Sequence, residues 1–213
     1  MAKTILFDLD GTLTDSGEGI INCVIPALAH FGLPIPSLDE LRSFVGPPLY
    51  DSFFRHGVPA DKTDEAVAVF RSRYLTTGIY ENHPYPGIPE LLQALCSRGD
   101  ILLVATSKPE QLANTVLNHF DLAKYFTCVC GATMDESRVT KEDVIAYLLS
   151  QYGDKANMVM VGDTHFDILG AAFHGIPAIG VSWGYGSVEQ MQAAGAAAIA
   201  DTPEELLRLL ETV

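Results

Sequence analysis

The chain has 213 residues, 48% hydrophobic and 19% charged, a composition that excludes intrinsic disorder and can bury a sizeable core. Its formal net charge of −14 argues against nucleic acid as a partner, because a polyanion would be repelled and no basic stripe is present. No apolar run reaches the roughly 20 residues of a membrane span and the N-terminus lacks a secretion-signal pattern, so we predict a cytoplasmic protein without a membrane partner.

The first predicted element is a short buried strand at residues 4–7, where apolar or β-branched residues follow one another without alternation. Two carboxylates, Asp8 and Asp10, follow it. Because strand side chains repeat every two residues, both should point the same way. Two such carboxylates repel each other unless a cation lies between them, although a strand-ending Asp and a helix-capping Asp would explain the pair without one.

Residues 17–80 are predicted to be helical and to form an inserted helical domain. Apolar residues recur at helix spacing over residues 18–31, and Ser37 with Glu40 three residues later has the pattern of a capping box. Further helical patches cover residues 49–56 and 61–77. The chain should cross between this domain and the rest, residues 1–16 and 81–213, near residues 14–17 and 80–86.

Strand-like and helix-like segments alternate from about residue 84 onward. This order predicts an α/β fold: a parallel Rossmann-like sheet with helices on both faces. Its ligand site should lie beyond the C-terminal ends of the strands, near the switch in strand order. The predicted strands are residues 101–106, 126–131, 158–163, 177–183 and 196–201, and the predicted helices are residues 88–97, 109–120, 141–152 and 166–174.

The stretch VMVGDTHFD, residues 159–167, repeats the opening pattern, since a buried strand again ends in a carboxylate, Asp163, with Asp167 four residues later. Carboxylates at the ends of two parallel strands can converge. A few carboxylates with phosphate and water are the oxygen ligands that Mg²⁺ prefers. A magnesium ion there would remove the repulsion between the aspartates of the first strand.

Four motifs in this order resemble those of the haloacid dehalogenase superfamily, and of its phosphoglycolate phosphatase-like branch in particular. They are DLDGT at 8–12, VATS at 104–107, Lys141 before a helix, and GDTHFD at 162–167. The resemblance covers nearly the whole chain, and the helical insertion resembles the helical cap of this family. It implies a phosphatase that acts on a small-molecule phosphomonoester, as a monomer or a homodimer.

The resemblance also implies a role for each motif residue. Asp8 would be the nucleophile that becomes an aspartyl phosphate, and Asp10 would be the general acid and then the general base. Lys141 would neutralise charge between nucleophile and phosphate. The phosphoryl oxygens would be held by Thr106, Ser107 and the backbone around Gly11, and Mg²⁺ by Asp8, the Asp10 carbonyl and Asp163, with Asp167 in support.

The helical cap is expected to set substrate specificity. A loop at residues 45–48 that contains Gly46 resembles its substrate-facing segment, and Arg42, Arg55 and His56 are the nearest candidates to meet an anionic substrate. Phosphoglycolate and nucleoside monophosphates both remain open as substrates. The loop Gly184-Tyr185-Gly186 resembles one common in the branch, and we assign it no catalytic role.

Two other functions stay open at this point. One is a phosphotransferase of the β-phosphoglucomutase kind, which would use the same aspartyl phosphate. The other is a phosphometabolite-binding protein with little turnover. The presence of Asp10 disfavours a pure binding protein, because binding alone needs no acid or base at that position. Dehalogenases of the superfamily are disfavoured because they lack this second acid.

Overall fold

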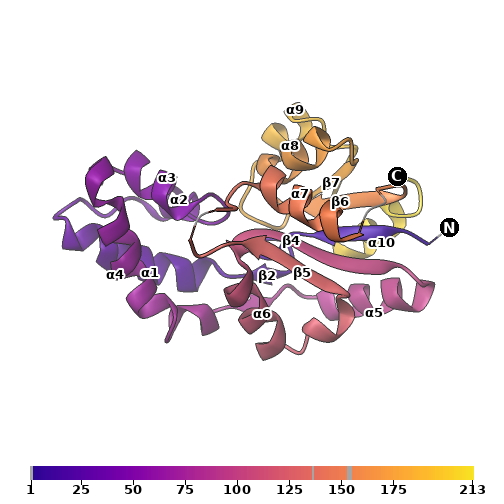
Figure 1. Cartoon of the computed structure of the whole chain (residues 1–213), viewed down its shortest axis with the longest axis horizontal. Coiled ribbons are helices and arrows are strands. Elements are labelled where there is room, and N and C mark those ends of the chain that lie inside the picture. The colour runs from indigo at the N-terminus through magenta and orange to yellow at the C-terminus, as the bar shows by residue number, and fades with distance from the viewer. Residues whose placement is uncertain (1, 136, 153–154) are drawn as a thin grey trace.

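The computed structural model of this chain describes residues 2–135, 137–152 and 155–213. A six-stranded sheet lies at its centre, with the strand order β5-β4-β1-β6-β7-β8 and every neighbouring pair parallel (Figure 1). The α/β fold predicted from the alternating segments is therefore confirmed. The strands are β1 (Thr4–Phe7), β4 (Ile101–Pro109), β5 (Cys128–Ala132), β6 (Met158–Gly162), β7 (Ala178–Val181) and β8 (Ala198–Ala200).

Helices cover both faces of this sheet, as Figure 1 shows. Successive residues of β1 are buried in two separate apolar clusters, Ile5 and Phe7 in one and Leu6 in the other, because strand side chains alternate between faces. The first face is covered by α5 (Ile88–Arg98), α6 (Glu110–His119) and α10 (Pro203–Leu209), and the second by α7 (Lys141–Tyr152), α8 (His165–Phe173) and α9 (Val188–Ala193).

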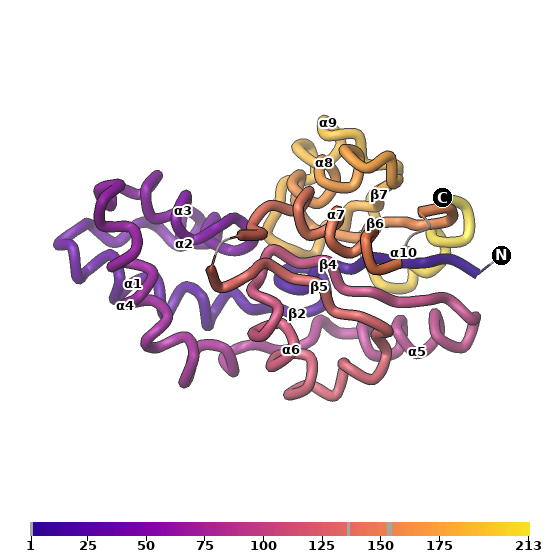
Figure 2. Tube along the Cα trace, viewed as in Figure 1, coloured from indigo at the N-terminus to yellow at the C-terminus, as the bar shows by residue number. Residues whose placement is uncertain are grey.

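Four helices lie to one side of the sheet and form what we call the helical block (Figure 2). They are α1 (Gly17–His30), α2 (Leu38–Arg42), α3 (Leu49–Arg55) and α4 (Thr63–Tyr74). The capping box of Ser37 and Glu40 is present at the start of α2, as predicted. The helix predicted over residues 61–77 is shorter, because it begins with a 3₁₀ turn, Ala60–Lys62, and α4 ends at Tyr74 ahead of another, Gly78–Tyr80.

The chain passes between the sheet and the helical block through a small antiparallel ribbon. Its strands are β2 (Thr14–Asp15) and β3 (His83–Pro84), with Asp15 opposite His83. Both lie where the sequence predicts the two chain crossings. The passages into and out of the helical block are therefore held together by backbone pairing.

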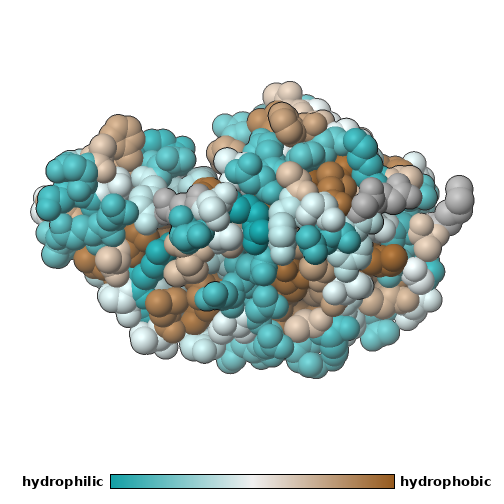
Figure 3. Space-filling model, in the orientation of Figure 1, coloured by the Kyte–Doolittle hydropathy of each residue, from teal (hydrophilic) through white to brown (hydrophobic). Residues whose placement is uncertain are grey.

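One apolar cluster continues from the sheet into the helical block. It contains Val104 of β4 together with Leu13 and with Phe44, Phe53 and Phe70 of the block, all of them buried. On the face drawn in Figure 3 the surface is hollowed between the helical block and the α8–α9 side of the sheet. Within the described residues, no helix combines the length and the hydropathy needed to cross a membrane.

Candidate active site

Three carboxylates from distant parts of the chain meet at the C-terminal edge of the sheet. Asp8 follows β1, Asp163 follows β6, and Asp167 lies in the first turn of α8. One oxygen of each lies within 4.8 Å of the others, and all three residues are buried. Because β1 lies between β4 and β6, where the strand order reverses, this is the switch point at which such sheets bind ligands.

Lys141 reaches the same point from the start of α7. Its Nζ lies 3.1 Å from Asp8 Oδ1 and 2.7 Å from Asp167 Oδ1, and it donates a hydrogen bond to the carbonyl of Ala105 at 2.9 Å. Burial acts to lower the pKa of Lys141, but the charges of Asp167 and Asp8 raise it above its usual value. The ammonium group is therefore held charged between two carboxylates.

The aspartates of this cluster are poorly compensated. Burial raises the pKa of Asp8 to about 6, against the opposing effect of Lys141. Burial, together with the charges of Asp167 and Asp8, raises the pKa of Asp163 to about 8. One lysine thus offsets only part of the negative charge, so a bound cation would relieve the rest.

The donor set fits a hard divalent cation. It consists of carboxylate oxygens, which are the ligands that Mg²⁺ prefers. The buried Oδ1 of Asp167 has the Lys141 ammonium as its neighbour and no hydrogen-bond donor of good geometry. A Cβ atom on Gly11 would lie 2.2 Å from Asp163 Oδ2, so only glycine fits beside that oxygen. The residues present therefore suit the metal that the sequence predicts.

The side chain of Asp10 points to a different partner, one that the sequence analysis missed. Lys108 Nζ donates hydrogen bonds to both Asp10 oxygens, at 2.8 and 3.0 Å, and a third to the Tyr74 hydroxyl at 2.5 Å. All three residues are buried. A lysine directly before Pro109, near the end of a strand that begins with an apolar run, is the sequence signal that could have identified it.

A pocket lies over these groups, between the sheet and the helical block. Of the residues predicted to hold substrate, Thr106, Ser107 and Gly46 line it. Asp8 and Asp10 form part of its floor with Lys108, and Arg71 of α4 also lines it, which the sequence analysis did not predict. Most of the other walls are apolar or aromatic: Ile20, Phe44, Pro47, Pro48, Leu49, Tyr50, Phe70, Tyr74, Pro109, Leu112, Ala132 and Val139.

The other cap residues named from the sequence lie elsewhere. Arg42 is not among the described residues that line this pocket; its side chain is exposed and pairs with Asp39 at 3.3 Å. His56 bonds to the carbonyl of Ser52 and packs against Phe44, one of the pocket walls. Arg55 lines a separate depression on the surface. The structure thus brings together the four motifs but not these three cap residues.

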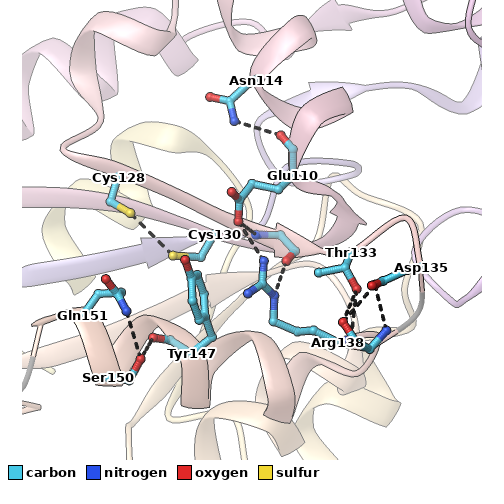
Figure 4. A network of polar contacts seen from close by, with 12 residues as sticks. Glu110, Asn114, Cys128, Cys130, Thr133, Asp135, Arg138, Tyr147, Ser150 and Gln151 are labelled. Atoms are coloured by element: carbon cyan, nitrogen blue, oxygen red, sulfur yellow. Dashed lines mark hydrogen bonds and ion pairs between the residues drawn. The ribbon is translucent and has the colours of Figure 1, made fainter.

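A second polar network joins β5, α6 and α7 (Figure 4). Arg138 donates hydrogen bonds to the carbonyl of Gly131, at 2.6 Å, and to Glu110 at the start of α6, at 2.9 Å. Its guanidinium group also lies 3.8 Å from the ring centre of Tyr147 on α7. These contacts tie the segment before Lys141 to β5, α6 and α7, so they help to fix where α7 begins.

Comparison with known proteins shows the family to which this chain belongs. A family profile described as haloacid dehalogenase-like hydrolase matches residues 5–181. A 5'-nucleotidase from Pseudomonas aeruginosa is 44% identical over 191 residues, covering 89% of this chain and 86% of that protein. A tyrosine-protein kinase PtkA from Mycobacterium tuberculosis is 40% identical over 188 residues, covering 88% of this chain and 64% of that protein.

The solved structures give the same result. The crystal structure of a predicted phosphatase from Clostridium acetobutylicum superposes with a TM-score of 0.95 at 38% sequence identity, covering 100% of both chains. The family predicted from the four motifs is thereby confirmed, and the fold agrees with it. This chain belongs to the haloacid dehalogenase-like hydrolases and is one of the phosphatases of that family.

Proposed function

We propose that this protein is a Mg²⁺-dependent phosphomonoester hydrolase that works through an aspartyl phosphate on Asp8. The observation that carries the proposal is the buried cluster of Asp8, Asp163 and Asp167 with Lys141 between two of its carboxylates. Asp8 also lines the pocket, so its carboxylate has access to a substrate. In this proposal residues 1–16 and 81–213, which contain the sheet, form the catalytic core domain, and residues 17–80 form the cap domain.

The chain's own residues can perform both steps of the reaction. In the first, the Asp8 carboxylate attacks phosphorus, the bond to the ester oxygen breaks, and Asp10 gives that oxygen a proton. In the second, Asp10 takes a proton from water, whose oxygen attacks phosphorus and releases Asp8. Lys141, Thr106, Ser107 and the backbone near Gly11 offset charge on the phosphoryl oxygens.

The metal would supply charge neutralisation. A Mg²⁺ ion held by Asp8, Asp163 and the Asp10 carbonyl, with Asp167 in support, would draw negative charge from the phosphoryl group.

The pocket supports a nucleoside monophosphate, or another ester with a flat apolar leaving group, over phosphoglycolate. Phe44, Phe70 and Tyr74 present aromatic side chains to the pocket, where a base can be buried. A small acid such as glycolate would instead need a cation close to the reacting phosphate. Of the two basic residues among the described lining, Lys108 is already paired with Asp10, and Arg71 lies on the cap helix α4.

Hydrolysis should require magnesium. We expect activity on p-nitrophenyl phosphate to be lost in excess chelator and restored by Mg²⁺, whereas Ca²⁺ should inhibit because its longer bonds and larger ligand number misplace the nucleophile. In a panel of phosphomonoesters, nucleoside monophosphates should have a higher kcat/KM than phosphoglycolate. Full activity in chelator would contradict the metal proposal, and a preference for phosphoglycolate would contradict the substrate class.

The same panel separates hydrolysis from the alternatives. A hydrolase releases one inorganic phosphate for each ester consumed, whereas a phosphotransferase moves the group to a second organic acceptor and releases little phosphate. A phosphometabolite-binding protein would consume almost no ester. Measuring inorganic phosphate and remaining ester together therefore distinguishes the three functions.

Lys108 should act by positioning Asp10. Lys108→Gln keeps at most part of the hydrogen bonding that Lys108 gives to the two Asp10 oxygens. We therefore expect kcat on an alkyl phosphate to fall by roughly 10²-fold, the cost of a misplaced reacting group, with little change in KM. Tyr74→Phe removes only the hydroxyl and should cause a smaller loss in the same direction. A raised KM with unchanged kcat would mean instead that Lys108 binds substrate.

A further inference from the structure

The loop between β7 and α9 holds the Asp163 carboxylate. The backbone N–H of Tyr185 donates to Asp163 Oδ2 at 2.9 Å, and the Thr12 hydroxyl donates to Oδ1 at 3.0 Å. Trp183 in turn donates its indole N–H to the Thr12 carbonyl at 3.0 Å. Both oxygens of Asp163 are therefore oriented by this loop, one directly and one through the segment that the loop contacts.

The two glycines beside Tyr185 allow the loop to close on Asp163. A Cβ atom at Gly184 would lie 2.4 Å from Asp163 Oδ2, and one at Gly186 would lie 2.0 Å from the Asp163 carbonyl oxygen. No side chain tolerates such contacts, so the backbone can approach this closely only where glycine stands. The glycines on both sides of Tyr185 are thus what lets this backbone pack directly against Asp163.

The hydroxyl of Tyr185 makes a second contact in the opposite direction. It bonds to the Asp15 carboxylate in β2, and it accepts a hydrogen bond from the Gly17 N–H, the first residue of α1, at 2.7 Å. A Cβ atom at Gly17 would lie 2.5 Å from this hydroxyl, so the contact again depends on glycine. Asp15 pairs in the ribbon with His83, at the point where the chain returns from the helical block.

We infer that Tyr185 is a positioning residue that links the orientation of Asp163 to the ribbon under the helical block. Its backbone N–H fixes a carboxylate at the metal site, while its hydroxyl fixes the same loop to both Asp15 and the start of α1. Whether the Tyr185 hydroxyl contacts the ribbon therefore changes the affinity of the site for Mg²⁺. By linkage, Mg²⁺ binding stabilises this contact. This inference rests on the metal site of the proposed function.

Tyr185→Phe tests the link, because it removes the hydroxyl but keeps the ring and the backbone N–H. Trp183 is the single tryptophan of the chain and bonds to the Thr12 segment, so its fluorescence reports Mg²⁺ binding without turnover. We expect the Mg²⁺ dissociation constant to rise roughly tenfold, as for other residues that support a metal ligand. The Mg²⁺-induced rise in Tm, measured in parallel, should need a correspondingly higher Mg²⁺ concentration.

Asp15→Ala removes the carboxylate to which the Tyr185 hydroxyl bonds. It should weaken Mg²⁺ binding by a similar factor, although Asp15 is not a proposed metal ligand. The double variant should be no worse than Tyr185→Phe alone, since that variant already lacks the contact with Asp15. Tyr80→Phe is the matched control, because the Tyr80 side chain is half exposed and its ring contacts His119 in a tilted arrangement. It should leave Mg²⁺ affinity unchanged.

The outcomes separate this inference from the proposed function. If the wild-type protein shows no Mg²⁺ response in fluorescence, in Tm or in chelator-sensitive turnover, the metal site itself is wrong and the inference falls with it. If the wild-type protein binds Mg²⁺ and both Tyr185→Phe and Asp15→Ala bind it equally well, the coupling alone is overturned. An effect of Tyr185→Phe without any effect of Asp15→Ala also overturns it, because the ribbon would then play no part.

Discussion

Asp8→Asn should abolish turnover of every phosphomonoester, with kcat lower by roughly 10⁴–10⁶, the scale of losing a nucleophile. A neutral amide is a poor nucleophile, and it is also a weaker ligand for a divalent cation. Asparagine has nearly the shape of aspartate, so it fits the buried position of Asp8. It lacks the charge that faces Lys141 Nζ, which lies 3.1 Å from Asp8 Oδ1. The loss should therefore be chemical, and the fold should be retained.

Acid quench of the enzyme with a radiolabelled ester measures the intermediate directly. Wild-type protein should retain acid-stable, base-labile phosphate, and Asp8→Asn should retain none. Asp39→Asn makes the same chemical change at an exposed site and should behave as wild type. Label retained by the Asp8→Asn protein would show that another residue is the nucleophile.

Asp10→Asn should separate the two steps of the reaction. With p-nitrophenyl phosphate the leaving anion is already stable, so the first step should survive in part. The attack of water on the aspartyl phosphate still needs a base, so the second step should slow by roughly 10²–10⁴, the usual contribution of general acid–base catalysis. Rapid-quench measurements should therefore show a burst of nitrophenol near one equivalent, followed by a slow steady state.

An alkyl phosphate provides the contrast for this variant. Its leaving oxygen needs a proton, so the first step should also slow and no burst should appear. The asparagine keeps the backbone carbonyl proposed as a metal ligand and can still accept a hydrogen bond from Lys108. If Asp10→Asn hydrolyses both esters at wild-type rates, the acid–base role of Asp10 is wrong.

The strand-end aspartates could be placed from the sequence because simple geometry relates them. Asp8 and Asp163 each follow a buried apolar strand, and parallel strands bring their C-terminal ends to one edge. The structure shows that β1 and β6 are in fact neighbours. Lys141 was instead assigned to the site by the family resemblance alone, although the helix that it begins was predicted with the bounds that the structure has.

The partners of Asp10 could not be placed because they depend on tertiary contacts. Lys108 lies 98 residues from Asp10 and 34 residues from Tyr74 in the chain, and no periodic pattern relates these positions. How the helical block packs over the sheet decides which of its side chains enter the pocket. Arg42 is near Gly46 in the chain, whereas Arg71 of α4 is the arginine that lines the pocket among the described residues.

The apolar cluster shared by the sheet and the helical block limits how this protein can evolve a new specificity. Ile20, Phe44, Phe70 and Tyr74 belong both to that buried cluster and to the walls of the pocket. A substitution that reshapes the pocket at these positions also removes packing from the core that the whole chain shares. Because natural proteins have little stability in reserve, most such changes would need a compensating substitution elsewhere before selection could keep them. Arg71 lines the pocket and is outside this cluster, so it can change at less cost to folding.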